Sequence, residues 1–514
     1  MAALLYSWRY FFVFIALLGL VGLFYFEENW RGPRAWEKYK KEHEVHGERF
    51  DAAAYVPAVV PPSENFAMTP FLAPLFDFLP GTQKWRSTNA LASVNNFAPE
   101  YDRAARAVKA EKSTRSNSWV TTEIDLLAWR AAYLQSTNRL NQPDATRTGQ
   151  GHPTNSIVSR QEAAEAVLAN LEEWRDVLEE LRESSNRKYS RFNLRYDSDD
   201  PAAILLPHLA TLKRICQVLQ LRATAELALG KTDEALSDIM LMLRIVDAPR
   251  VEPILVSQLV RFAMLYLAVE PIASGVGKWS EPQLKALEER LRQFDFCADM
   301  KQALEGERAL FGMGCIEFLR REPDKYNDLV GDGKFPGAIW TAVPNGWFDL
   351  EKLNYRHFFD EFVVPSVDAT NRLISPMLCR QFEQRMAKDA STSRVRAFFA
   401  HKAFCSLLLP QGLGMARKTA FVQTAVDTGA IACAIERFKL ANGRLPRSPE
   451  ELVPKFLDKL PHDIINGQAL KYISSPDGHY AIYSIGWNEK DEGGLAGFKK
   501  GEHDVPEEGD WVWR

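Results

Sequence analysis

Residues 221–246 read LRATAELALGKTDEALSDIMLMLRIV, two apolar patterns of helical period joined at Gly230. Leucine, isoleucine and methionine recur every three or four positions, which is typical of helices that each bury one face. Similar patterns continue outward through residues 159–410, and this region opens with a capping box formed by Ser159 and Glu162. The sequence therefore predicts a mainly α protein with an α-helical bundle over residues 159–410.

The helix pair around Gly230 resembles a single tetratricopeptide-type repeat. Gly230 and Lys231 occupy the turn, and Ala235, Ile239 and Met242 follow along the second helix. No second copy follows about 34 residues later, although such folds need about three repeats to bury a core. We expect a bundle with tetratricopeptide-like helix pairs. Their grooves would bind a peptide or a partner helix, or the helices would pack only on one another.

The N-terminus carries the most apolar segment. Residues 10–26 (YFFVFIALLGLVGLFYF) have no charge and no strongly polar group. With the weaker apolar residues before them, they approach the roughly 20 residues that a helix needs to cross a bilayer. A cleaved signal peptide is the alternative, but its usual small-residue cleavage site is missing. We expect residues 1–28 to form an uncleaved transmembrane anchor in the inner (cytoplasmic) membrane.

Residues 29–158 form the expected juxtamembrane region, which is helical in part and irregular elsewhere. A polar helix is expected over residues 33–50 and another helix over residues 118–138, whereas the Gly- and Pro-rich residues 140–157 predict a surface loop.

Two later stretches call for separate predictions. Residues 254–269 are apolar, but Arg261 and other polar residues interrupt them, so they predict a buried helix rather than a second span. Residues 320–365 are aromatic and rich in Gly and Pro, which predicts an irregular segment laid against the bundle, with its aromatic side chains in the core.

Residues 411–514 predict a small α+β head with an acidic tail. Gly443 ends a long helix, because glycine suits the left-handed C-terminal cap. A Pro476-Asp477-Gly478 turn separates two strand-like runs. The expected elements are, in order, a long helix (419–441), a short helix from Ser448 with a capping box, and two strands (470–473 and 480–485).

This order of elements and the residues within them resemble the soluble head of type II secretion pseudopilins, above all the major pseudopilin (protein G-like). The whole chain also resembles a family of large, single-anchor bacterial membrane proteins of unknown function that end in this head. The matching residues are Ile435-Glu436-Arg437-Phe438, Asn442-Gly443-Arg444-Leu445-Pro446, Glu450-Glu451-Leu452, Leu460-Pro461, the strand over 480–486 and the acidic, glycine-rich loop after it.

Two departures from the pseudopilin pattern affect what the resemblance implies. The head of a pseudopilin follows its apolar helix directly, whereas residues 27–418 intervene here, and the peptidase site for pilin processing is absent. The resemblance therefore implies a borrowed docking head rather than a pilus subunit. It also implies a periplasmic bulk, whereas the Lys and Arg residues after the anchor favour a cytoplasmic one.

The resemblance further implies a calcium loop after the last predicted strand. Calcium takes six to eight oxygen ligands, which several carboxylates on one loop can supply. A solvated acidic tail is the alternative. The candidate ligands are Asn488, Asp491, Glu492, Asp504 and Asp510.

Composition and motifs exclude several classes of protein. The 514 residues include 63 Lys+Arg and 67 Asp+Glu, so no basic excess recruits nucleic acid. The six cysteines form no Cys-x-x-Cys pair, and His43 and His46 stand one residue short of the His-Glu-x-x-His spacing. The glycine before Gly230 that a phosphate-binding loop requires is missing. No enzyme motif and no cofactor other than Ca²⁺ is indicated.

These observations favour a non-catalytic, membrane-anchored scaffold or docking protein of the bacterial envelope, with a link to secretion and with protein partners there. Two alternatives stay open. One is a membrane-tethered hydrolase whose site lies in the helical bundle, and the other is a tetratricopeptide-like adaptor that faces the cytoplasm.

Overall fold

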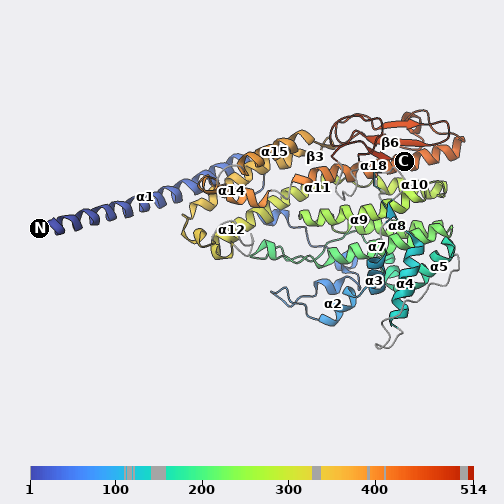
Figure 1. Ribbon diagram of the computed structural model, residues 1–514, viewed down its shortest axis with the longest axis horizontal. Coiled ribbons are helices and arrows are strands. Elements are labelled where there is room, and N and C mark those ends of the chain that lie inside the picture. The colour runs from blue at the N-terminus through green and yellow to red at the C-terminus, as the bar shows by residue number, and fades with distance from the viewer. Residues whose placement is uncertain are drawn as a thin grey trace.

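The computed structural model describes residues 2–108, 111–112, 118–119, 122–140, 158–326, 337–390, 394–409, 413–497 and 507–514. Helices dominate this part of the chain, and one of them projects far beyond an elongated body (Figure 1). The predicted mainly α fold, with an N-terminal apolar helix and a small sheet near the C-terminus, is confirmed.

The projecting element is α1 (Ala2–Glu44). The separate helix expected over residues 33–50 is instead the second half of α1, and it ends at Glu44. Ion pairs one turn apart, such as Lys40–Glu37 at 2.6 Å, support helix beyond the apolar segment. Pro33 lies inside it and removes only the one helical hydrogen bond to the carbonyl four residues earlier.

Three described helices are long and apolar enough to cross a membrane: Tyr10–Glu44, Pro201–Ala228 and Leu255–Ser274. The most apolar 18-residue window is 44% buried inside the body in the second and 67% buried in the third, but 0% buried in the first. The prediction of a buried helix at residues 254–269 is therefore confirmed, and α1 alone among the three carries its apolar segment outside the body.

The bundle is built on the predicted helix pair. Gly230 adopts φ +75° between α7 and α8, a turn that a side chain would strain. The Ser159 and Glu162 capping box begins α5 as predicted. The helices are α5 (Arg160–Leu171), α6 (Arg175–Ser184), α7 (Pro207–Ala228), α8 (Thr232–Asp247), α9 (Leu255–Ser274), α10 (Glu281–Leu291) and α11 (Phe296–Gly306). The likeness of α7 and α8 to a tetratricopeptide repeat stays a prediction.

Shorter elements cover one side of this bundle. α3 packs on α4, and α4 packs on α5 (Figure 1). The loop expected over residues 140–157 lies outside the described residues except for residue 140, the last of α4. The elements are α2 (Thr88–Asn95), α3 (Pro99–Ala107), β1 (Glu111–Lys112), β2 (Thr122–Glu123) and α4 (Leu126–Leu140).

The aromatic segment 320–365 is more regular than predicted. It contains α14, because Trp347, Leu350 and Tyr355 recur at helical spacing and are all buried. Two π-helical turns, η8 (Glu307–Gly312) and η11 (Phe359–Val363), adjoin this part of the body. The other elements are α12 (Met313–Arg321), α14 (Gly346–Phe358), β3 (Val367–Asp368), β4 (Leu373–Ile374), α15 (Pro376–Ala390), α16 (Arg394–Phe399) and α17 (Ala403–Leu408).

The C-terminal region follows the predicted order, with one strand added. α18 (Leu413–Asn442) ends at Gly443, whose φ is +69°. The expected short helix is a 3₁₀ turn, η14 (Pro449–Leu452), without a side-chain cap from Ser448. The three strands form one antiparallel sheet in the order β5–β6–β7: β5 (Lys471–Ser474), β6 (Tyr480–Ser484) and β7 (Trp511–Trp513).

One hydrophobic core joins the C-terminal region to the bundle. α18 packs on α9, α10 and α11, and side chains from Phe66 to Trp513 share one buried cluster. The backbone N–H of Ser118 donates to the carbonyl of Val512 at 2.8 Å, which ties β7 to the N-terminal half of the chain. The domain boundaries expected at 158/159 and 410/411 stay a prediction, since residues on both sides of each pack in the same core.

Candidate functional site: the anchor junction and the polar clusters of the body

The outer half of α1 has the surface of a membrane anchor. Residues 10–24 are exposed all round the helix, with Phe11, Leu17 and Leu23 exposed by 55%, 55% and 62%. No other part of the described body covers this segment before Phe24, where α1 meets the body (Figure 1). An uncovered apolar surface of this length is compatible with a bilayer around it.

Two glycines cross where α1 enters the body. A Cβ on Gly32 would lie 2.7 Å from the carbonyl carbon of Gly346, and a Cβ on Gly346 would lie 2.9 Å from the Cα of Asn29. The backbone N–H of Gly346 donates to the side-chain oxygen of Asn29 at 2.8 Å. Only glycine permits this approach, so α1 and α14 touch backbone to backbone.

Aromatic contacts flank the crossing on its outer side. Phe24 meets Trp347 edge to face, with ring centroids 6.0 Å apart. The hydroxyl of Tyr25 donates to the carbonyl of Ala342. The body therefore begins directly below the apolar segment, with no linker between them.

The inner end of α1 lies in a cluster of polar side chains: Tyr39, His43, Glu48, Arg308, Arg356 and Asp360. Asp360 accepts from the Tyr39 hydroxyl and pairs with both arginines, of which Arg308 lies on η8 and Arg356 on α14. Arg356 also pairs with Glu48. Burial, with the Asp360 carboxylate as a second cause, raises the pKa of Tyr39. These contacts fix the second half of α1 to the body at both ends.

This cluster also contains the one group of possible metal ligands found among the described residues. Ligand atoms of His43, Glu48 and Asp360 lie within 4.8 Å of one another. Both carboxylates already pair with Arg356, so a cation there would meet a guanidinium group. His46 does not join them, because its Nδ1 lies 2.8 Å from the carbonyl of Glu42. The arrangement is that of an ion-pair junction.

The structure brings together three of the five predicted calcium ligands. The carboxylate of Asp510, fully buried, accepts the backbone N–H groups of Glu492 at 3.3 Å and of Gly494 at 2.6 Å. Asn488 donates to the Glu492 carboxylate at 2.7 Å. Burial and the neighbouring Glu492 carboxylate raise the pKa of Asp510.

The other two predicted ligands do not join this group. Asp491 accepts from the Tyr483 hydroxyl at 3.2 Å and lies 3.4 Å from Lys471, on the side of the sheet. Asp504 lies outside the described residues. Within the described chain the Oε2 atom of Glu492 is buried without a hydrogen bond. Calcium at this loop stays a prediction that now depends on Asn488, Glu492 and Asp510.

The bundle contains one buried set that bears on the hydrolase alternative. Nε2 of His208 lies 2.8 Å from Oε1 of Glu252, and the Ser257 hydroxyl donates to the other oxygen of the same carboxylate. A nucleophilic serine needs the histidine, not the carboxylate, as its direct partner. The three side chains are at most 2% exposed, so this set has the character of a buried structural contact.

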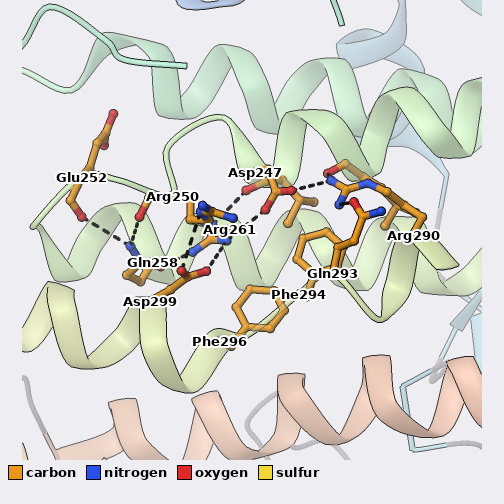
Figure 2. Close-up of polar contacts among 12 residues, drawn as sticks. Asp247, Arg250, Glu252, Gln258, Arg261, Arg290, Gln293, Phe294, Phe296 and Asp299 are labelled. Atoms are coloured by element: carbon orange, nitrogen blue, oxygen red, sulfur yellow. Dashed lines mark hydrogen bonds and ion pairs between the residues drawn. The ribbon is translucent and has the colours of Figure 1, made fainter. Parts of the chain in front are cut away.

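Beside it lies a larger network that sequence reasoning missed (Figure 2). Arg261, fully buried on α9, pairs with Asp247 at 3.4 Å and with Asp299 at 3.0 Å. Arg290 from α10 pairs with the same Asp247, and Arg250 lies 3.8 Å from Asp299. Arg261 was the only signal in the sequence, as a charge inside an apolar helix, and its two carboxylate partners, Asp247 and Asp299, come from separate segments.

The six cysteines are all buried and free. Burial raises the pKa of each thiol, so none has the character of a reactive thiolate. Their interpretation as small core residues agrees with this environment.

Comparison with known proteins adds no assignment. No protein-family model, no curated protein and no solved structure matches the chain. The resemblance to the pseudopilin head therefore stays a prediction, and any function must be argued from the anchor, its junction and the polar clusters.

Proposed function

We propose that the chain is a non-catalytic scaffold or docking protein of the bacterial envelope, held in the inner membrane by α1. One observation carries the proposal: the exposed apolar half of α1 continues without a break into a half that is locked against α14. Such a helix holds the body at the membrane surface in one orientation. A fixed orientation suits a protein that presents a surface to partners.

The side of the membrane and the link to secretion rest on the C-terminal head. A long helix, a 3₁₀ turn and an antiparallel hairpin follow one another there, in the order that the pseudopilin resemblance implies. Pseudopilin heads lie outside the inner membrane, so the proposal includes a periplasmic body with partners in the envelope. The Lys and Arg residues after the anchor favour the opposite side.

Protease accessibility tests this proposal. Two versions of the full chain carry an epitope tag, one at the N-terminus and one at the C-terminus. In spheroplasts we expect external protease to remove the C-terminal tag and to spare the N-terminal one, whereas both tags disappear after lysis. The N-terminal tag is the matched control, because a single span places the two ends on opposite sides.

The reverse pattern would refute the periplasmic body and favour the cytoplasm-facing adaptor. Release of the protein by salt or carbonate washing would refute the anchor itself. Partners are then sought by cross-linking in intact cells, where a scaffold is expected to yield a defined set of envelope proteins.

A further inference from the structure

A strongly basic cavity lies at the edge of the buried network of Figure 2. It has a volume of about 620 Å³ and opens to solvent. Small-molecule sites in proteins fall between about 300 and 1,000 Å³. Five segments line it: the extended run 57–60, residues 187–191 after α6, the end of α8 with the turn that follows, the end of α10, and Gln302 of α11.

The lining is basic. One carboxylate, Asp247, stands among six cationic side chains: Arg187, Lys188, Arg191, Arg244, Arg250 and Arg290. Directly behind the lining, Arg261 and Asp299 add one charge of each sign. The excess of positive charge is therefore five.

Neutral acceptors hold several of these arginines in place. Arg244 donates to the backbone carbonyls of Ser185 at 2.9 Å and of Arg187 at 3.1 Å. Arg191 donates to the carbonyl of Pro57 at 2.9 Å. Backbone carbonyls orient a guanidinium group without cancelling its charge, so these cations stay available to a ligand.

Within the described residues, Arg187, Arg191 and Arg244 have no carboxylate within ion-pair distance. Burial lowers the pKa of Arg244, the Asp247 carboxylate opposes this, and the neighbouring Arg290 and Arg250 lower the pKa further. A folded protein gains nothing from crowding like charges into a partly closed space. A bound anion would remove that repulsion.

The floor of the cavity is rigid. Arg290 pairs with Asp247 and also donates to the carbonyl of Leu243 at 2.8 Å, while Asp247 is held from below by Arg261 (Figure 2). Preformed donors cost a ligand less on binding than donors that must first be ordered. The mouth of the cavity is more exposed than its floor, since the Arg250 side chain there is 51% exposed.

We propose that this cavity binds a small polyanion that carries phosphate groups. Guanidinium forks match phosphate oxygens in pairs, and a phosphate group brings more charge than a carboxylate to offset the excess. The ring of Tyr189 and the side chains of Val60 and Val251 line the same space and offer contact to an apolar part of the ligand. A free phosphate-bearing metabolite and a phospholipid headgroup share this chemistry. The inference does not depend on the side of the membrane.

Titration calorimetry with sodium pyrophosphate tests the proposal on the full chain in phosphatidylcholine nanodiscs. We expect one pyrophosphate per chain and weaker binding as NaCl is raised. The variant Lys188→Gln/Arg250→Gln removes two exposed charges at the mouth. The fold should be kept, because the Arg250–Asp299 pair is long (3.8 Å) and half-exposed on the arginine side, and such a pair contributes little to stability. The variant should weaken binding about tenfold or more, since one charge-assisted hydrogen bond is worth roughly that factor.

The control variant Arg175→Gln/Lys285→Gln also removes two exposed charges, but neither lines the cavity. Their side chains are 71% and 55% exposed. The control variant should bind as the parent does. Absence of binding by the parent, or equal weakening in both variants, would overturn the proposal. Repeating the titration in nanodiscs that contain phosphatidylglycerol separates the two sources. If the natural ligand is a phospholipid headgroup, the anionic lipid should compete and weaken pyrophosphate binding. If it is a soluble metabolite, the affinity for pyrophosphate should stay the same.

Discussion

Replacing Gly32 by alanine should loosen the anchor from the body. The new Cβ would lie 2.7 Å from the carbonyl carbon of Gly346 and 2.8 Å from its Cα, whereas carbon atoms pack best at about 3.5–4.0 Å. The overlap is therefore about 1 Å, and both neighbours are backbone atoms that no rotamer change can move. α1 and α14 must separate by about that distance.

Two opposing effects on the free energy of unfolding decide the size of the change. Overpacking of this kind costs about 1–3 kcal/mol, while alanine in place of a helical glycine returns about 1 kcal/mol. The difference between these two figures is a net loss of up to about 2 kcal/mol. Gly22→Ala is the matched control, because Gly22 lies on the same helix and a Cβ there meets nothing within 4 Å.

Urea unfolding of the full chain in detergent, followed by tryptophan fluorescence, measures the difference. We expect Gly32→Ala to lower the urea concentration at the midpoint without changing the slope of the transition. Trp347 lies beside the crossing, so its fluorescence reports on the junction. Gly22→Ala should unfold at the parent's midpoint or slightly above it, because it gains the helix propensity of alanine without a clash. If both variants have the same midpoint, the backbone contact between the two helices is not as close as described, and the rigid junction fails with it.

Three further predictions concern the body. Burial raises the pKa of Glu307 from 4.5 to about 7, so between these pH values the folded state keeps a proton that the unfolded chain releases, and the free energy of unfolding should fall as pH rises. Glu307→Gln should flatten this dependence in urea titrations at several pH values, and an unchanged dependence would contradict the raised pKa of Glu307. Asp463 accepts from the backbone N–H groups of Ile465 and Ile485 and from the Ser484 hydroxyl, so Asp463→Ala should lower stability by roughly 2 kcal/mol or more, measured against Asp458→Ala, whose side chain is 84% exposed. The six buried thiols should react with Ellman's reagent only after denaturation, and a fast-reacting thiol in the native protein would show that its burial is incomplete.

Local signals in the sequence predicted most of the helices. The Ser159 capping box, the Gly230 turn and the Gly443 cap each depend on a few neighbouring residues, and each is found where expected. The exposed apolar half of α1 was predicted correctly because its pattern is unbroken over residues 10–26. Where the pattern was weaker, at residues 320–365, the aromatic spacing of α14 was hidden by nearby Gly and Pro.

Features that depend on distant residues could not be predicted. β7 is three residues long and pairs with β6 across a long loop. The glycine crossing joins residues 32 and 346, and nothing near either glycine in sequence reveals the other. The basic cavity likewise collects side chains from five segments, of which only residues 187–191 (RKYSR) are markedly basic on their own.

The unbroken passage of α1 into the body has a consequence for encounters at the membrane. A domain on a flexible linker samples a volume of positions, and its effective concentration near a partner depends on linker length. Here Phe24 and Tyr25 already touch the body, so no such volume exists when α1 spans a bilayer. The search for a partner is reduced to lateral diffusion and to rotation about the membrane normal, and a partner must present its own site at one fixed height.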